Sequence, residues 1–276
     1  MNTILDEIIA QTRQDLEQVK RRLPEPRLRE LLAAPAAVPD FHAALAPAAD
    51  GRPRVIAELK RASPSKGQIR NDFGVVSLAG ELEEHGAAAL SVLTEPRWFQ
   101  GSPQYLRAVA ANAGIPVLRK DFIVDPYQVL EARAWGASAI LLIAAALTPP
   151  EFAKLHGLAR ELGLAVLAEV HTPEELKWVV QTGVRVIGVN SRDLHSFHTS
   201  LERSAEVLAE IPGDRLAVAE SGLRTGGDLA ALAAAGADAF LIGETLMRAA
   251  HPGVKLNELL EDATAAGYHP GGQRHR

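Results

Sequence analysis

The sequence contains no cysteine, which excludes disulfide bonds, thiolate metal ligands and a cysteine nucleophile. It has no surplus of positive charge, because 29 Lys and Arg against 34 Asp and Glu leave a net charge of −5, and this argues against nucleic acid as a partner. The longest apolar run, Ala139 to Leu147, has nine residues, whereas a membrane helix needs about 20. The first residues carry acid where a signal peptide carries positive charge. We therefore expect an intracellular, cytoplasmic protein without a membrane or nucleic-acid partner.

Residues 1–53 are predicted to form a helical extension ahead of the main domain. Apolar residues recur at helical spacing over the first 20 positions, and Thr3 begins the pattern of a capping box. Pro24 and Pro26 are expected to stop this helix, and a short helix is possible at Phe41–Leu45. Because about 50 residues are too few for a comfortable core, we expect the extension to pack on the mouth or the base of the following domain.

From residue 54 to residue 262, short apolar runs alternate eight times with helix-like segments. The runs are Val55–Leu59, Ala88–Leu93, Pro116–Leu118, Ala139–Ile143, Ala165–Ala168, Val186–Val189, Leu216–Ala219 and Ala239–Ile242. Runs that are apolar on both faces are typical of parallel strands covered by helices. Eight units in one chain favour an α/β fold of the (β/α)₈ TIM-barrel type, with an open doubly wound sheet as the alternative. The polar residues 263–276 are predicted to be a disordered tail.

Polar residues end four of the runs, where a barrel of this kind carries its active site. Side chains alternate across a strand, so Glu58 and Lys60 share the face predicted to line the barrel. Lys120 shares this orientation, and burial there would weaken its preference for charge and make it a proton donor near neutral pH. Glu169 and Asn190 end two further runs. Each residue alone has an ordinary explanation, as a buried ion pair, a surface lysine or a turn asparagine. Together they indicate an acid–base site.

The last two runs end in glycine-containing turns that favour an anion site. Ser221 and Gly222 follow the seventh run and Gly243 follows the eighth, where barrels often bind phosphate through backbone N–H groups. The loop that contains Ser63 could close over the same ligand, or could be a flexible surface loop. The sequence has no G-x-G-x-x-G motif, no P-loop and no ligand-like spacing of histidines, so we expect neither a cofactor nor a metal.

Several of these segments resemble the indole-3-glycerol phosphate synthase family of tryptophan biosynthesis. The matching segments are 56–67, 91–95, 99–102, 118–123, 169–171, 188–194 and 219–222, and the resemblance runs from the first helix to about residue 260. It implies a (β/α)₈ barrel with an N-terminal helical segment and a carboxy-lyase that needs no cofactor. The reaction that it implies closes the indole ring of 1-(2-carboxyphenylamino)-1-deoxyribulose 5-phosphate and releases carbon dioxide and water.

The resemblance also implies catalytic roles. Lys120 would be the general acid that protonates the substrate carbonyl oxygen, and Glu169 would be an acid/base in the later loss of water. Glu58 would assist this chemistry and hold the two lysines. Lys60 would contact the substrate carboxylate, and its share of the proton donation with Lys120 stays open. Asn190 would orient the anthranilate part and the reacting hydroxyl.

The remaining implied residues bind substrate. Arg192 would act together with the asparagine in orienting the substrate. The phosphate would be held by Ser63, Ser221, Gly222 and Gly243. Glu244 stands where some relatives carry serine, and its carboxylate would repel phosphate. An apolar wall should press on the aromatic ring, and its candidates, for which ordinary core packing is the alternative, are Phe99, Phe122, Leu141 and Leu194.

Two rival functions remain at this point. A barrel like phosphoribosylanthranilate isomerase is disfavoured by the absence of cysteine, because a resemblance to that family would imply a Cys/Asp acid–base pair. A non-catalytic barrel subunit of a pathway complex is disfavoured because Glu58, Lys120 and Glu169 are all present. The partner that we expect is a small phosphorylated substrate, bound by a monomer or a weak homo-oligomer.

Overall fold

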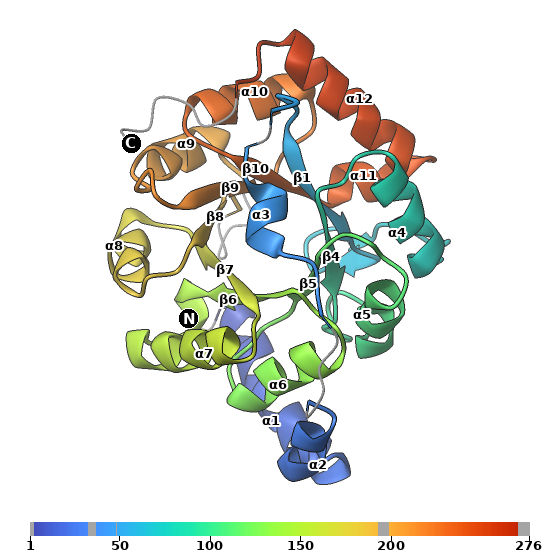
Figure 1. Ribbon diagram of the computed structural model, residues 1–276, viewed down its shortest axis with the longest axis vertical. Helices are drawn as coiled ribbons and strands as arrows, with labels where there is room; N and C mark the ends of the chain where they lie inside the picture. Colours follow the sequence, from blue (N-terminus) through green and yellow to red (C-terminus); the bar gives the residue numbers. More distant parts are fainter. Residues whose placement is uncertain (1–2, 33–36, 48, 193–198, 270–276) are drawn as a thin grey trace.

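Eight parallel strands close into a barrel, which confirms the predicted (β/α)₈ fold (Figure 1). The computed structural model describes residues 3–32, 37–47, 49–192 and 199–269. The barrel strands are β1 (Arg54–Leu59), β4 (Ala89–Leu93), β5 (Val117–Lys120), β6 (Ala139–Ile143), β7 (Ala165–Val170), β8 (Val186–Asn190), β9 (Leu216–Glu220) and β10 (Ala239–Ile242). Each predicted run therefore became a strand, and β1 pairs with both β4 and β10 to close the ring.

Helices cover the outside of the barrel, and four of those described below begin at a capping side chain followed by proline, which is suited to a first helical turn. They are α4 (Val75–Glu84), α5 (Pro103–Ala110), α6 (Pro126–Ala134), α7 (Pro149–Glu161), α8 (Pro173–Gln181), α9 (Leu201–Ala209), α10 (Gly226–Ala234), α11 (Glu244–Arg248) and α12 (Pro252–Ala265), with a 3₁₀ turn η1 (Ala144–Ala146). The predicted domain boundary at residue 262 falls inside α12, whose Ala263 is buried. Tyr268 is also buried and packs on Phe240, whereas residues 270–276 lie outside the described chain.

The alternation predicted for β1 is confirmed by the packing of its side chains. Val55, Ala57 and Leu59 belong to the apolar layer between the strands and the helices. Ile56 belongs to a separate apolar cluster inside the barrel, and Glu58 shares its face. The polar strand ends therefore point to the inside of the barrel at its carboxyl end.

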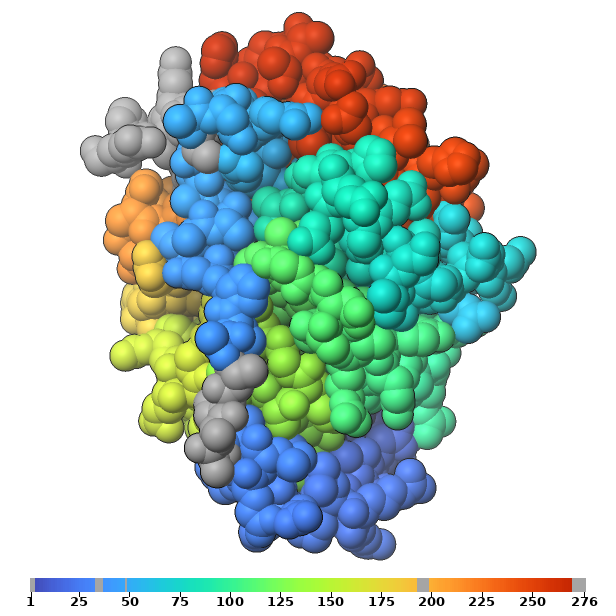
Figure 2. Space-filling view, turned by 45° about the vertical axis from the view of Figure 1, so that its right-hand side comes forward, coloured from blue at the N-terminus to red at the C-terminus, as the bar shows by residue number. Residues whose placement is uncertain are grey.

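The N-terminal extension forms three helices: α1 (Ile4–Arg22), α2 (Glu25–Glu30) and α3 (Phe41–Leu45). The capping box of Thr3 with Asp6 is present. The two prolines do end α1, but they do not end the helical structure, because Pro26 occupies the first turn of α2, where its missing N–H has no partner to lose. Figure 2 shows α1 and α2 at one end of the molecule and residues 37–47 running along its surface.

The extension reaches both ends of the barrel. Phe41 and Leu45 of α3 are fully buried in the inner cluster beside Ala89, Ala139 and Ala239, the first residues of three strands, so α3 closes the base. In Figure 1 this helix lies across the ring of strands.

Helix α1 lies instead at the opposite end, where Lys20 pairs with Asp125 at 2.7 Å and Tyr127 donates a hydrogen bond to the Leu23 carbonyl at 2.7 Å. Both partners belong to the loop and helix that follow β5. Among the described residues, no helix combines the length and apolar character that crossing a bilayer requires.

Candidate active site

A cavity of about 640 Å³ opens at the carboxyl ends of the barrel strands. Apolar side chains of α1, Ile4, Leu5 and Ile8, form part of its rim. The predicted site residues that line it are Glu58, Lys60, Ser63, Phe99, Lys120, Phe122, Leu141, Glu169, Asn190, Arg192, Ser221, Gly222 and Gly243. Leu194 lies outside the described residues. The expectation that the site lies at the carboxyl ends of the strands therefore identified residues up to 185 positions apart, from 58 to 243, that line one cavity.

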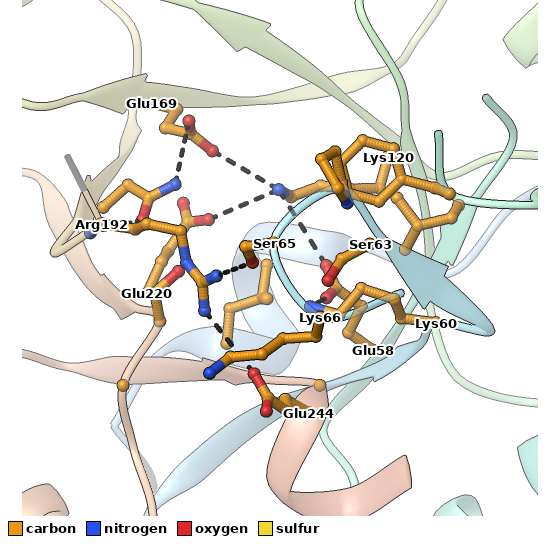
Figure 3. A pocket seen from close by; sticks show the side chains of 18 of the residues that line it. Glu58, Lys60, Ser63, Ser65, Lys66, Lys120, Glu169, Arg192, Glu220 and Glu244 are labelled. Carbon is orange, nitrogen blue, oxygen red and sulfur yellow. Dashed lines mark hydrogen bonds and ion pairs between the residues drawn. The ribbon is translucent and has the colours of Figure 1, made fainter. Parts of the chain in front are cut away.

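Lys120 lies at the centre of a buried cluster of carboxylates (Figure 3). Its Nζ is 3.4 Å from Glu169 Oε2, 3.8 Å from Glu220 Oε2 and 4.0 Å from Glu58 Oε2. The three glutamate side chains are no more than 4 % exposed, so little water screens these charges. A single cation thus holds three acidic groups from three different strands within its reach.

Two further contacts orient the cluster. Lys60 Nζ donates a hydrogen bond to Glu58 Oε1 at 2.6 Å, so this carboxylate bridges the two lysines. Asn190 Nδ2 donates to Glu169 Oε1 at 3.2 Å, while its own Oδ1 accepts the backbone N–H of Arg192 at 3.0 Å. Each predicted catalytic side chain is consequently held by a neighbour within the same site.

Burial and the neighbouring charges shift the pKa values of the glutamates Glu58 and Glu169 in opposite directions. Burial would raise the pKa of Glu58, but Lys60 and Lys120 outweigh it and lower that pKa. Burial would likewise raise the pKa of Glu169, but Lys120 and His171 outweigh it and lower it. Both carboxylates are therefore ionised at neutral pH.

The pKa of Lys120 corrects the sequence prediction. Burial alone would lower this pKa, as expected, but the carboxylates of Glu169, Glu220 and Glu58 raise it well above its ordinary value. The prediction was wrong in direction because it counted the low-polarity wall and not the acidic groups on the neighbouring strands. The lysine therefore carries its proton throughout the neutral range.

Glu220 is a site residue that the sequence prediction missed. Its side chain is 1 % exposed, and burial together with Glu169 raises its pKa well above the ordinary value, so it keeps its proton to a higher pH than an ordinary glutamate. A Cβ on Gly188 of the adjacent strand would lie 2.0 Å from Glu220 Oε1, so only glycine leaves room for this carboxyl. The signal was available, because Glu220 has the same alternation with Val218 as Glu58 has with Ile56.

Gly243 has a packing role that its sequence context did not reveal. A Cβ there would lie 2.4 Å from Glu58 Oε1, so the glycine makes room for the carboxylate of Glu58 on the neighbouring strand β1. The prediction gave the glycine only a role in letting the backbone approach a ligand. Its backbone still borders the cavity, directly before α11.

The residues predicted to bind an anion lie mainly in the turns after β9 and β10. Ser221 and Gly222 both have left-handed backbone conformations, with φ of 67° and 77°, which turn the chain sharply at the cavity wall. Ser191 Oγ donates to the Ser221 carbonyl at 2.8 Å and holds this turn. Ser63 faces the same cavity from the hairpin β2 (Ala62–Ser63) and β3 (Gly67–Gln68) that follows β1.

Charged side chains surround this turn region. Arg192 donates a hydrogen bond to Ser65 in the hairpin loop and lies 3.6 Å from Glu244 Oε2, so it spans two loops (Figure 3). Glu244 lines the cavity and also pairs with Arg248 at 3.0 Å. Burial would raise the pKa of Glu244, but Arg248, Lys66 and Arg192 lower it. The basic residues that the sequence prediction missed are Lys66, Arg224 and Arg248, all of which line the cavity.

Two of the predicted wall residues meet as an aromatic pair. The rings of Phe99 and Phe122 lie 6.0 Å apart, and both line the cavity with Leu141. Glu95 fixes the loop that carries Phe99, because its buried carboxylate accepts the backbone N–H groups of residues 97, 98 and 99 at 2.8, 2.7 and 3.0 Å. The cavity thus has an apolar side beside β4 and β5 and a polar side beside β9 and β10.

The fold and this site together define a (β/α)₈-barrel enzyme whose acid–base groups lie at the carboxyl ends of the strands. A family model described as indole-3-glycerol phosphate synthase matches residues 5–259. The chain therefore belongs to the indole-3-glycerol phosphate synthase family, and it is a carboxy-lyase.

Relatives with curated names agree with this assignment. A protein of Acidithiobacillus ferrooxidans named indole-3-glycerol phosphate synthase is 48% identical over 263 residues, which are 95% of this chain and 100% of that protein. A protein of Rhodopirellula baltica with the same name is 49% identical over 249 residues, which are 89% of this chain and 94% of that protein.

Solved structures that match the chain share its fold. The KGPDC of Streptococcus mutans aligns with a TM-score of 0.60 at 11% identity and covers 78% of this chain and 99% of its own. A mandelate oxidase mutant aligns with a TM-score of 0.59 at 17% identity, covering 89% of this chain and 86% of its own. At these identities the likeness concerns the barrel alone.

Proposed function

We propose that this chain closes the indole ring of 1-(2-carboxyphenylamino)-1-deoxyribulose 5-phosphate, with Lys120 as the general acid at the carbonyl oxygen. The observation that carries the proposal is the position of Lys120 Nζ, which lies within 4.0 Å of Glu58, Glu169 and Glu220 and faces the cavity. These carboxylates keep the lysine protonated, so its proton is in place before the substrate binds.

The proposed reaction follows the arrangement of the site. The ring carbon that bears the carboxylate attacks the carbonyl carbon, and Lys120 gives a proton to the carbonyl oxygen. The carboxylate leaves as carbon dioxide, and its electron pair restores the aromatic ring. Glu169, ionised at rest, then takes the proton from the adjacent carbon and gives a proton to the new hydroxyl, which leaves as water. Asn190 holds Glu169 in place through its 3.2 Å hydrogen bond.

Glu58 and Lys60 support these steps. Glu58 contacts both lysines and fixes the distance between them. Lys60 reaches the cavity from the end of β1, where it is suited to receive the substrate carboxylate. Its hydrogen bond to Glu58 leaves further N–H groups for an anion, because an ammonium carries three donors.

The phosphate is assigned to the polar side of the cavity, at Ser221, Gly222, Gly243 and Ser63. Support comes from their common position on the cavity wall and from Lys66 and Arg192, which add positive charge beside these turns. Glu244 opposes an anion here, because its carboxylate lines the cavity and occupies two arginines.

Inorganic phosphate tests this assignment. It should compete with the substrate, and Glu244→Gln should bind it more tightly, because the change removes a negative charge and frees Arg192 and Arg248. Glu258→Gln, on the exposed face of α12, is the matched control and should leave phosphate binding unchanged. Equal processing of a phosphate-free substrate analogue would contradict the assignment.

The aromatic part of the substrate is assigned to the apolar side, against Phe99, Phe122 and Leu141. Helix α1 completes this wall through Ile8, so we assign residues 1–53 to the barrel enzyme as a covering segment rather than to an independent domain. Removal of residues 1–23 should raise KM and preserve the fold, because α3 remains to close the base. Removal of residues 1–50 should also lower the free energy of unfolding, and full stability of that variant would contradict the assignment.

We also assign a cytoplasmic monomer or weak homo-oligomer. The closed barrel leaves no strand edge open for pairing, which supports this state. The large exposed apolar side chains of the described residues, Leu31, Val76 and Val254, lie on different helices or their ends. Sedimentation equilibrium measures the state directly, and a stable dimer at low concentration would contradict it.

Product formation tests the proposed function most simply. The purified chain should convert the substrate to an indole product, followed by its fluorescence, and release one carbon dioxide per product. Glu169→Gln should lower kcat by about 10²- to 10⁴-fold, whereas Glu161→Gln, at the outer end of α7, should leave kcat unchanged. A chain that binds the substrate without turning it over would be a non-catalytic barrel.

A further inference from the structure

The proposed reaction has a proton balance that the site must satisfy. The substrate loses its carboxylate as neutral carbon dioxide, and its carbonyl oxygen leaves as water. Two protons are added to that oxygen and one is lost from carbon, so each turnover takes up one proton from solvent. Because the carboxylates that exchange these protons are buried and the substrate fills the mouth above them, the proton needs a route that does not pass through the substrate.

His171 approaches one oxygen of the Glu169 carboxylate, Oε1, whereas Lys120 approaches the other, Oε2. It follows β7, and the backbone alternation gives it the same orientation as Glu169. Its Nε2 is 3.5 Å from Glu169 Oε1, and its Nδ1 is 3.7 Å from Glu175 Oε2. Within the described part of the chain, neither ring nitrogen makes a hydrogen bond, although both are buried. The imidazole thus lies between two carboxylates, and each of the two gaps is slightly longer than a hydrogen bond.

Glu175 connects this imidazole to the surface. Its side chain is 20 % exposed, compared with 10 % for His171 and 3 % for Glu169, so exposure rises along the series. Glu175 lies in the first turn of α8, and its Oε2 accepts the backbone N–H of His171 at 2.6 Å. This hydrogen bond fixes the carboxylate beside the ring.

The charged groups that face His171 come from three elements. Glu169 lies on β7, Glu175 on α8 and Lys120 on β5. Burial and Lys120 would lower the pKa of His171, but the two glutamates outweigh them and raise it. The ring therefore holds a second proton to a higher pH than an ordinary histidine, and the doubly protonated ring is the state that a proton donor to Glu169 requires.

We propose that His171 and Glu175 form the route by which the solvent proton reaches Glu169, with His171 as a positioning and relay residue that acts through Glu169. The inference rests on the acid/base role of Glu169 in the proposed function. The gaps of 3.5 and 3.7 Å are slightly longer than hydrogen bonds, as is common for catalytic contacts before the substrate binds.

The step balances as proton transfers alone. Lys120 has given a proton to the carbonyl oxygen, and Glu169 has returned to the departing hydroxyl the proton that it took from carbon, so the proton still missing is that of Lys120. His171, protonated on both ring nitrogens, passes its Nε2 proton to Glu169 Oε1, and Glu169 passes it on to Lys120 Nζ, which is 3.4 Å from its Oε2. A turn of the neutral ring then presents its free nitrogen to Glu175, which returns a proton to it and takes one from solvent. No other bond forms or breaks.

The pH dependence of kcat separates a relay from a structural role. His171→Asn keeps a polar side chain of similar reach but cannot carry a proton. Its kcat should equal that of the wild type at mildly acid pH and fall to about a tenth or less at alkaline pH, where solvent protons are scarce. A merely structural residue would lower kcat equally at every pH. His156→Asn is the control, because His156 is a buried histidine on α7 that packs on Phe152 away from the mouth.

A second variant tests the route without touching the histidine. Glu175→Gln keeps an oxygen that can accept the backbone N–H of His171 but loses the titratable group. It should show the same alkaline loss of kcat as His171→Asn, and the double variant should be no worse than either single one. Added imidazole should restore alkaline activity to His171→Ala and leave the wild type unchanged.

Two results would overturn the inference: a uniform loss of kcat across pH in His171→Asn, or wild-type pH profiles in both His171→Asn and Glu175→Gln. A failure of the proposed function is distinguishable, because it appears as a fully active Glu169→Gln. If His171→Asn is poorly folded, Glu175→Gln decides alone. A direct readout is the imidazole titration followed by NMR, in which Glu175→Gln should lower the pKa of His171, and an unchanged pKa would contradict the contact.

Discussion

The two ends of the barrel are built from the same strands and differ in what fills them. At the base, three of the strands begin with buried alanines, Ala89, Ala139 and Ala239, and Phe41 and Leu45 close the interior with apolar side chains that are fully buried. At the mouth, the carboxyl ends of the strands place the buried carboxylates of Glu58 and Glu169 beside Lys120, whose side chain is 15 % exposed. The base gains from burial, whereas the mouth buries charges that would be better solvated.

The base of the barrel thus contributes mainly to stability, whereas the mouth carries the groups proposed for the chemistry. An apolar plug can be tight because it has no bond to change during turnover. The mouth buries acidic and basic groups beside each other, and this raises the pKa values of both Glu220 and Lys120, which lie 3.8 Å apart. Substitutions at the two ends should therefore affect different measurements.

The largest effect is expected for Lys120→Ala. The variant should lose about 10²- to 10⁴-fold in kcat, because the proton donor is gone, while KM should change little. Lys154→Ala, on the exposed side of α7, is the matched control and should retain full activity. An unchanged kcat in Lys120→Ala would remove the chemistry from the mouth.

Phe41→Ala should have the opposite profile. Removing this buried ring from the base should lower the free energy of unfolding by about 3–5 kcal/mol, measured by denaturant unfolding, with kcat preserved where the variant is folded. Leu31→Ala, at an exposed position, should change stability little. Normal stability combined with a lost kcat would show that α3 serves the mouth and not the base.

A smaller loss is expected for Gly243→Ala. The added Cβ would lie 2.4 Å from Glu58 Oε1, which is too close. It would therefore shift the carboxylate that holds both lysines. We expect kcat to fall by about 10- to 100-fold, as for other small displacements of catalytic groups. Gly80→Ala, on α4, is the control because nothing lies within 4 Å of its added Cβ. Equal kinetics of the two variants would mean that Glu58 can move without consequence.

The smallest effect is expected for Glu220→Gln, and it should be a gain in stability. Burial and the neighbouring Glu169 raise the pKa of Glu220, so above its ordinary range the unfolded chain has lost a proton that the folded chain still holds. The stability of the wild type therefore falls with rising pH through this group. Glu220→Gln lacks that dependence and should melt a few degrees higher at neutral and alkaline pH, with the difference vanishing at acid pH. Glu202→Gln is the exposed control on α9. A lower melting temperature of Glu220→Gln at alkaline pH would contradict the raised pKa of Glu220.

The sequence predicted the fold of the molecule better than the pKa values and the packing of its site residues. The strands and the inward orientation of Glu58 were accessible because apolar runs and side-chain alternation are local properties. The pKa of Lys120 and the fit of Gly243 against Glu58 were not, because they depend on which strand ends meet across the barrel. Glu220 was accessible by alternation but was interpreted only as part of the anion turn.

The histidine beside the site shows the same limit. His171 has no metal-like spacing in the sequence, and its meaning comes only from the two carboxylates that the fold brings to its ring. The role of an ionisable residue that follows a barrel strand is therefore best inferred from the side chains that the fold brings beside it.

The most direct test of the central claim is a crystal structure with a reduced, unreactive substrate analogue. The account predicts that the oxygen in place of the carbonyl lies within about 3 Å of Lys120 Nζ, with the phosphate against the N–H groups of Ser221 and Gly222 and the aromatic ring against Phe99 and Phe122. The reversed orientation, with the phosphate beside the aromatic pair and Lys120 out of reach of the oxygen, would contradict it.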